Sequence, residues 1–160
     1  MAKVIVNQFG KRSFGGAAGA YGNTTVLHFQ LQTNASGAVV NSNSGAALAI
    51  GDVVDLGPLP EGIRLIDSLA VISDALTASA TGSLGFAYED GVDSAEVPQD
   101  AAYFGAGIVL SATARLRNSS SKALVTLPKP ARLVLTIAGA AIAEAGKVDI
   151  VITGELTGPR

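Results

Sequence analysis

Few residues in this 160-residue chain could carry out acid-base or nucleophilic chemistry. It contains no cysteine and a single histidine, His28. A Ser-His-Asp arrangement would have to use His28, which falls on the polar face of an alternating segment, Thr25 to Gln32. The lack of cysteine excludes thiol nucleophiles, disulfides and cysteine-ligated metal sites. We therefore expect a surface histidine and a protein that is not an enzyme.

Carboxylates gather between Glu89 and Asp100, in the run EDGVDSAEVPQD. Such oxygens could surround calcium, but their spacing does not match a twelve-residue calcium loop. A solvated acidic loop is expected, with no metal and no other cofactor. Basic residues cluster loosely in the later segments without interleaved aromatic residues, and the acidic loop offers them partners. With a net charge of -2, the chain is not expected to bind nucleic acid; the basic residues are Arg115, Arg117, Lys122, Lys129 and Arg132.

The composition points to contact with other protein. Hydrophobic residues make up 48% of the chain and charged residues only 15%, against about a quarter charged in typical soluble domains. This balance indicates that much of the surface lies against protein, although a monomer rich in small residues would show it too. The longest apolar run, Leu133 to Ala143, is too short to span a membrane, and the first residues lack a signal-peptide core. No membrane association is expected.

The chain divides into an arm and a body. Residues 1–51 contain no Asp or Glu, and Phe14 to Gly22, FGGAAGAYG, is dense in Gly and Ala without periodicity. This run lacks the Gly-Lys-Ser/Thr of a phosphate-binding loop. We expect an extended N-terminal arm over residues 1–22 and a single β domain over residues 23–160. The arm either stays disordered or lies across a neighbouring subunit, and its candidate contact residues are Phe9, Lys11, Arg12, Phe14 and Tyr21.

Short alternating segments separated by turn residues fill the body. About eight such strands, with no long amphipathic helix, predict an antiparallel β-sandwich or jelly roll. The only helix-like windows are Asp74 to Thr81 and Ala140 to Ala145, both too short for a βαβ unit. The expected strands are Thr25–Gln32, Ala46–Leu56, Ile63–Ser73, Ser83–Tyr88, Gly107–Leu116, Lys122–Leu127, Arg132–Ala138 and Lys147–Leu156.

A corner containing two prolines joins two of these strands. Because proline lacks a backbone donor, Pro58 and Pro60 predict that one strand ends at Leu56 and that the next begins near Ile63. Gly62 is expected to take a positive φ, and Leu59 to fill apolar space under the corner.

The run GDVVDLGPLPEGIRLIDSLAVIS, Gly51 to Ser73, resembles tailed-bacteriophage virion proteins of the head cement or decoration type. A Leu-Gly-x-Leu-Pro-x-Gly corner before a long strand looks familiar in that class, as does a closing strand like KVDIVITGELTG. The Gly-Phe-Ala-Tyr strand that ends at Tyr88 and the later Ala-Tyr-Phe of Ala102 to Phe104 strengthen the likeness, which covers Gly51 to Gly158 and leaves out the arm.

The resemblance implies a jelly-roll protein that binds the outside of the capsid and stabilises it. Its partners would be the major capsid protein and further copies of itself, as dimers or trimers, and it would be made in the host cytoplasm before joining the virion surface. A phage tail or other fibre subunit is an alternative. A carbohydrate-binding module or a hydrolase on the same scaffold is another, weakened by the absence of tryptophan and the lone histidine.

Overall fold

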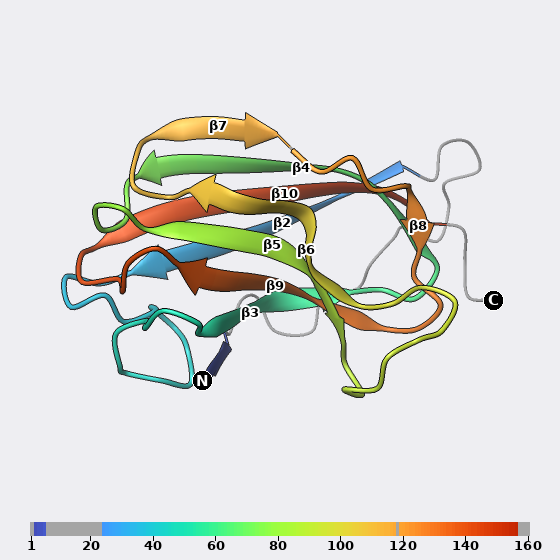
Figure 1. The fold of residues 1–160 in the computed structure, drawn as a ribbon, viewed down its shortest axis with the longest axis horizontal. Helices are drawn as coiled ribbons and strands as arrows, with labels where there is room; N and C mark the ends of the chain where they lie inside the picture. The colour runs from blue at the N-terminus through green and yellow to red at the C-terminus, as the bar shows by residue number, and fades with distance from the viewer. Residues whose placement is uncertain (1, 6–23, 118, 157–160) are drawn as a thin grey trace.

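The computed structural model describes residues 2–5, 24–117 and 119–156, which form two facing β-sheets (Figure 1). Each sheet contains five strands, counting one that lies off the main path of the second sheet. In spatial order, the first sheet comprises β1 (Lys3–Ile5), β3 (Val53–Leu59), β9 (Ala131–Ala138), β5 (Thr81–Tyr88) and β6 (Asp100–Val109). The second comprises β2 (Thr24–Thr33), β10 (Gly146–Leu156), β4 (Ile63–Asp74) and β7 (Ala114–Arg117), with β8 (Val125–Thr126) also paired to β4.

The strand order is that of a jelly roll. When the short strands β1 and β8 are set aside, the second sheet contains the first, eighth, third and sixth of the remaining strands, and the first sheet contains the second, seventh, fourth and fifth. Successive strands therefore alternate between the sheets except at the β5–β6 hairpin, as two interleaved Greek keys require. The predicted all-β sandwich is confirmed.

Alternation places the apolar side chains between the sheets. On β2, β5, β9 and β10, the residues expected to face inward are buried, while their neighbours along each strand are more exposed. These buried residues are Leu27, Phe29, Leu31, Leu84, Phe86, Tyr88, Leu133, Leu135, Ile137, Val148, Ile150 and Ile152.

The proline corner differs in part from its prediction. Strand β3 does not end at Leu56 but continues through Gly57 and Pro58, paired with β9 across a register shift. Gly57 adopts a φ of 152°, and beyond Asp55 the other side of β3 is no longer paired to β1, so proline is tolerated at this bulged edge. Leu59 is fully buried and Gly62 has a φ of 75°, both as expected.

Five other windows also differ. In the strand expected from Ala46 to Leu56, residues 46–52 precede β3, and of the strand expected from Lys122 to Leu127 only Val125–Thr126 forms β8. The segment expected to form one strand from Gly107 to Leu116 is split between β6 and β7 by a turn at residues 110–113. The two helix-like windows, residues 74–81 and 140–145, form turns and extended chain, and the described residues contain no helix. Such short windows cannot offset the cost of helix nucleation, and in the first of them the Leu76 N–H donates instead to the Leu110 carbonyl.

A buried carboxylate ties three strands of the first sheet together. Asp55 on β3 is 2% exposed, and both its oxygens accept from Nε of Arg132 on β9, at 2.9 and 3.1 Å. Lys3 on β1 approaches the same carboxylate at 3.3 Å. Thus the first residues of the segment assigned to the arm form a strand parallel to β3, held by hydrogen bonds and charge.

Replacing Arg132 should show how much the free energy of unfolding depends on pairing the buried Asp55 carboxylate. Arg132→Ala leaves the buried Asp55 carboxylate with Lys3 alone, and we expect the free energy of unfolding to fall by about 3 kcal/mol in urea titrations. The matched control is Arg115→Ala on β7, an exposed arginine, which should change it by less than about 0.5 kcal/mol. Equal effects of the two substitutions would contradict a structural role for the Asp55 carboxylate.

Asp52 should make the free energy of unfolding depend on pH in the acid range. Its carboxylate accepts the N–H groups of Ala49 and Ala2, at 2.9 and 3.0 Å, and these bonds lower the pKa of Asp52 below its usual value of 3.8. A lowered folded pKa stabilises the fold above the usual value, and this contribution disappears as the pH falls through the folded pKa. Asp52→Asn should therefore cost about 1 kcal/mol at pH 7, and this cost should shrink as the pH falls through the folded pKa, measured by urea unfolding. The exposed Glu144→Gln serves as control, and a pH-independent cost at Asp52 would refute the assignment.

Candidate interaction surface

The contact residues predicted from sequence lie outside the described part of the chain. Phe9, Lys11, Arg12, Phe14 and Tyr21 all fall within residues 6–23. Their contact role therefore remains a prediction. The described residues show a different feature, which no sequence pattern had singled out.

Two long connections meet at one end of the sandwich (Figure 1). Residues 89–99 join β5 to β6, and residues 118–130 join β7 to β9 with β8 between them. The Tyr88 hydroxyl donates to the Val97 carbonyl, and the Tyr103 hydroxyl donates to the Ala123 carbonyl at 2.9 Å. Two tyrosines whose rings lie in the core therefore each hold one connection by a hydrogen bond.

The tyrosines belong to an aromatic cluster. The Phe86 ring lies edge-on to the rings of Tyr88 and Tyr103, with centroids 5.9 and 5.5 Å apart, and Tyr103 is edge-on to Phe104 at 4.9 Å. Such pairs are favourable beyond the area they bury. Burial raises the pKa of both tyrosines, so both hydroxyls stay protonated donors at neutral pH.

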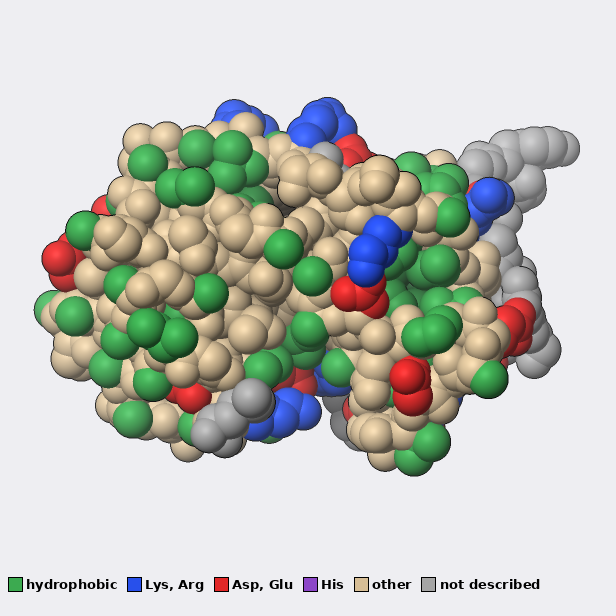
Figure 2. All heavy atoms as spheres, viewed as in Figure 1, with side chains coloured by type: hydrophobic (Ala, Val, Ile, Leu, Met, Phe, Trp, Pro, Cys, Tyr) green, Lys and Arg blue, Asp and Glu red, His purple; other side chains and the backbone are tan. Residues whose placement is uncertain are grey.

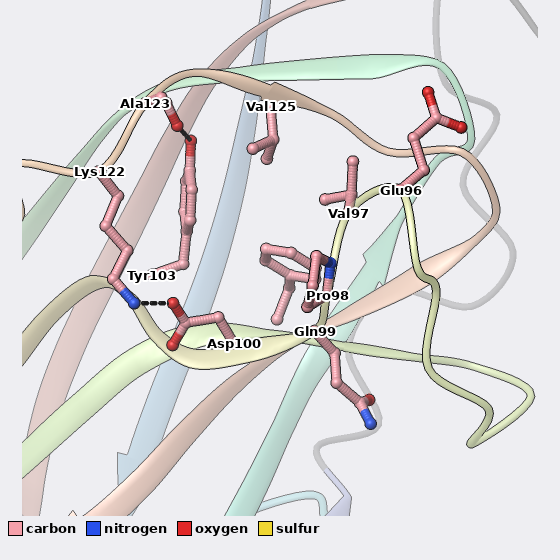
Figure 3. A pocket seen from close by; sticks show the side chains of 10 residues that line it. Glu96, Val97, Pro98, Gln99, Asp100, Tyr103, Lys122, Ala123 and Val125 are labelled. Atoms are coloured by element: carbon pink, nitrogen blue, oxygen red, sulfur yellow. Dashed lines mark hydrogen bonds and ion pairs between the residues drawn. The ribbon is translucent and has the colours of Figure 1, made fainter.

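Between the two connections lies an open pocket of about 310 Å³ (Figure 3). Its inner side is aromatic, with apolar side chains on the facing walls and polar groups around the opening. The residues that line it are Phe86, Glu96, Val97, Pro98, Gln99, Asp100, Tyr103, Lys122, Ala123 and Val125.

Ion pairs hold the pocket's surroundings in place. Lys122 contacts Asp100 at the opening, as drawn in Figure 3. Partial burial raises the pKa of Asp100, but the bonds from Lys122 and from the Ala102 N–H together lower it. Lys129 contacts Asp90 at 2.7 Å and lies 4.5 Å from the centroid of the Tyr88 ring.

The expectation that the acidic loop pairs with basic residues is thus confirmed for Lys122 and Lys129. The other basic residues differ. Arg132 is held mainly by Asp55, and Arg117 pairs with Asp67 on β4.

The remaining candidate chemical groups are separate from one another. In the acidic loop, Asp93 accepts the N–H groups of Ser94 and Gln99, at 2.8 and 2.7 Å. Within the described ranges, no three His, Cys, Asp or Glu residues are placed to hold a metal ion. His28 lies on the outer face of β2, with 43% of its side chain exposed and Nε2 2.9 Å from Asp149. It is the surface histidine that the sequence predicts.

Part of the outer face of the first sheet, away from the ion pairs of Asp55 and Asp100, carries few charges. Figure 2 shows this side of the molecule, where many charged side chains lie near the margins, one adjoining basic and acidic pair lies nearer the middle, and a broad area remains without charge. Apart from Arg132 and the buried Val134, the outward positions of β5 and β9 include small or weakly polar side chains of intermediate exposure: Thr81, Ser83, Ala87, Thr136 and Ala138. This face and the neighbouring pocket together form the candidate interaction surface. No helix among the described residues has the length and apolar character needed to cross a membrane.

Two solved capsid structures share this fold over almost the whole chain. A chain in the capsid of Ralstonia phage GP4 superposes with a TM-score of 0.67 at 14% identity, covering 98% of this chain and 99% of that one. A chain in the capsid asymmetric unit of cyanophage Pam1 superposes with a TM-score of 0.57 at 15% identity, covering 92% and 94%. No protein-family model and no curated protein matches the sequence. At these identities the likeness demonstrates a common fold.

Gly85 should be essential to the geometry of the pocket. A Cβ at this position on β5 would lie 2.0 Å from the Asp100 carbonyl oxygen, where the start of β6 passes close to β5. Because backbone cannot yield like a flexible side chain, Gly85→Ala should cost about 3 kcal/mol in urea unfolding and reduce the near-ultraviolet circular dichroism of the tyrosines. The control is Gly45→Ala, whose Cβ would meet nothing within 4 Å. If Gly85→Ala changed neither the free energy of unfolding nor the circular dichroism, this close approach of β6 to β5 would not be required.

Proposed function

We propose that the protein is a non-enzymatic structural component of a phage virion, which binds the outside of the capsid shell and stabilises it. The proposed partner is the major capsid protein, with self-association into dimers or trimers on the shell. The observation that carries this proposal is the superposition with chains of two phage capsids over 92 to 98% of this chain. The corner from Gly51 to Ser73, which resembles the cement and decoration class, gives independent support.

The physical character of the molecule suits such a role. A sandwich whose connections are fastened by buried tyrosines offers a rigid surface, and rigid partners lose little conformational freedom on binding. The uncharged area on the outer face of the first sheet limits the cost of desolvating fixed charges.

Stabilisation requires no chemistry. A protein that binds the assembled shell more tightly than its dissociated subunits shifts the equilibrium toward the shell by mass action. The absence of cysteine fits synthesis in a reducing host cytoplasm and persistence outside the cell without disulfides.

The test uses the purified full-length chain and shells of the phage that encodes it, prepared without this protein. We expect the chain to sediment with the shells up to a saturating ratio and to raise the temperature at which they come apart. Failure to bind, or binding to isolated tails instead, would overturn the assignment to the capsid.

The arm's contribution should be tested without disturbing β1, because Lys3–Ile5 belongs to the first sheet. Replacing Phe9, Lys11, Arg12 and Phe14 with Ser is expected to weaken shell binding by about tenfold or more, as 1.4 kcal/mol of lost contact would. The control replaces Arg64 and Arg115, both exposed on the second sheet, with Ser. Unchanged affinity in the arm variant would remove the arm from the shell contact.

A further inference from the structure

The connections between successive strands from β2 onward alternate between the two ends of the sandwich (Figure 1). The pocket and the acidic loop lie at one of these ends. The opposite end, which we call the charge-poor end, is formed by four connections. They are residues 34–52, 75–80, 110–113 and 139–145.

The charge-poor end has one exposed charged residue within its four connections, Glu144, since the carboxylate of Asp52 is buried. Asp74 and Lys147, at the ends of β4 and β10, adjoin it on the second sheet. Its other exposed side chains are Ser, Asn, Thr, many alanines and Ile50, which is 60% exposed. This end therefore presents an apolar and weakly polar surface to its surroundings.

The other end of the sandwich is charged, with both signs present. In Figure 2 the left half of the molecule, which contains the charge-poor end, shows charged side chains only near its margin, whereas blue and red side chains lie across the right half. The connections at the charged end, residues 60–62, 89–99 and 118–130, include Glu61, Glu89, Asp90, Asp93, Lys122 and Lys129.

Hydrogen bonds join the four connections of the charge-poor end to one another. The Ile142 N–H donates to the Leu48 carbonyl at 2.8 Å, and the Ala143 N–H donates to the Thr77 hydroxyl at 2.7 Å. The Leu110 N–H donates to the last carbonyl of the connection between β4 and β5, at 3.0 Å. The surface is thus held by hydrogen bonds rather than by ion pairs, and a surface ordered in advance loses little conformational freedom on binding.

The charge-poor end continues onto the first sheet. Thr81 on β5 is paired in register with Val109 on β6 and with Ala138 on β9, at the strand ends that meet these connections. Thr81 and Ala138 are outward positions of intermediate exposure, and Val109 is 48% exposed. The end and the uncharged area of the first sheet therefore form one continuous surface.

Such a difference between two ends suits a protein that meets a shell on one side and solvent on the other. Charged residues are depleted in the centre of protein interfaces, because removing them from water costs free energy. Charges on a surface that stays in water favour solubility. The charge-poor end fits the first situation and the charged end fits the second.

We propose that the charge-poor end, with the adjoining row of Val109, Thr81 and Ala138, docks on the shell. Its partner is an uncharged protein surface of the shell, which packs against Ile50 and the exposed alanines. The charged end, with the pocket and the acidic loop, then faces solvent. This proposal rests on the proposed function and deepens it by naming the side of the molecule that makes the contact.

The test places charges on the charge-poor end of the full-length protein. The triple variant Ala47→Glu, Ile50→Glu, Ala141→Glu alters three exposed positions, so the free energy of unfolding in urea should stay close to that of wild type. We expect its affinity for shells, measured by cosedimentation, to fall by about tenfold or more, because three charges would have to be desolvated in the contact.

The matched control adds the same charge at the other end. Val92→Glu, Ala95→Glu, Leu124→Glu also replaces three exposed apolar side chains, so any general repulsion between an acidic variant and the shell affects both triple variants equally. We expect its affinity for shells to stay within about twofold of wild type, as for surface substitutions outside a contact.

The sign of the introduced charge gives a second measurement. Lysine at the same three positions, 47, 50 and 141, should also weaken shell binding, because a charge of either sign loses its hydration in an uncharged contact. Tighter binding of the lysine variant would show that the shell surface is acidic and would contradict an uncharged partner.

Three further results would overturn the proposal: equal losses in the two glutamate variants, a loss in the control variant alone, or a loss that accompanies broken self-association in sedimentation velocity without shells. The last result would assign the charge-poor end to a contact between copies. Failure of the proposed function is distinguishable from all of these, because the wild-type chain would then not bind shells.

Discussion

The aromatic cluster of Phe86, Tyr88, Tyr103 and Phe104 is the interaction on which the loop end of this sandwich depends. Elsewhere the core consists mainly of Leu, Ile, Val and Ala between the two sheets, and among the residues that the structure describes the only other aromatic one within it is Phe29. The cluster concentrates bulky side chains where β6 departs from regular pairing. Between its partners Leu84 and Phe86, β6 advances from Gly105 to Asp100, so both Tyr103 and Phe104 can turn inward.

This irregularity gives the connections their order. A regular β6 would send one of two adjacent residues outward, and that aromatic ring would be lost to the core. Because both rings are buried, the Tyr103 hydroxyl can reach the Ala123 carbonyl, just as the Tyr88 hydroxyl reaches Val97. The pocket is thus a consequence of core packing and lies between two loops that are each anchored by one tyrosine.

The regular strands could be predicted from sequence because each buries one face. The alternation of apolar and polar residues in β2, β5, β9 and β10 predicted both the strands and the residues that face inward. Prediction failed where the local preferences of residues such as proline differed from the strand pairing that the sheet adopts. Pro58 was expected to end a strand, yet β3 accommodates it beyond the Gly57 bulge, where its outer side is no longer paired to β1. The turn at residues 110–113 was hidden because an apolar run continues into it, and Leu110 is buried there.

The pocket could not be predicted for a different reason. Its residues come from β5, β6, the acidic loop and the connection after β7 that contains β8, and only the β6 bulge and the jelly-roll crossing bring them together. A partial signal was present in the sequence, since two tyrosines, Tyr88 and Tyr103, flank an acidic loop that lacks positive charge. Buried tyrosine hydroxyls need acceptors, and long neighbouring loops supply carbonyls.

Acidic residues are distributed unevenly along the chain and across the first sheet. Acids are absent from residues 1–51, and the acidic loop lies beside β5 and β6, on the far side from the β1 edge. The first sheet is pinned at the β1 edge by the buried Asp55 carboxylate and its two cations, and toward the β6 edge by the aromatic cluster. The two edges of the first sheet are therefore held by different interactions, which are ionic at the β1 edge and aromatic toward the β6 edge.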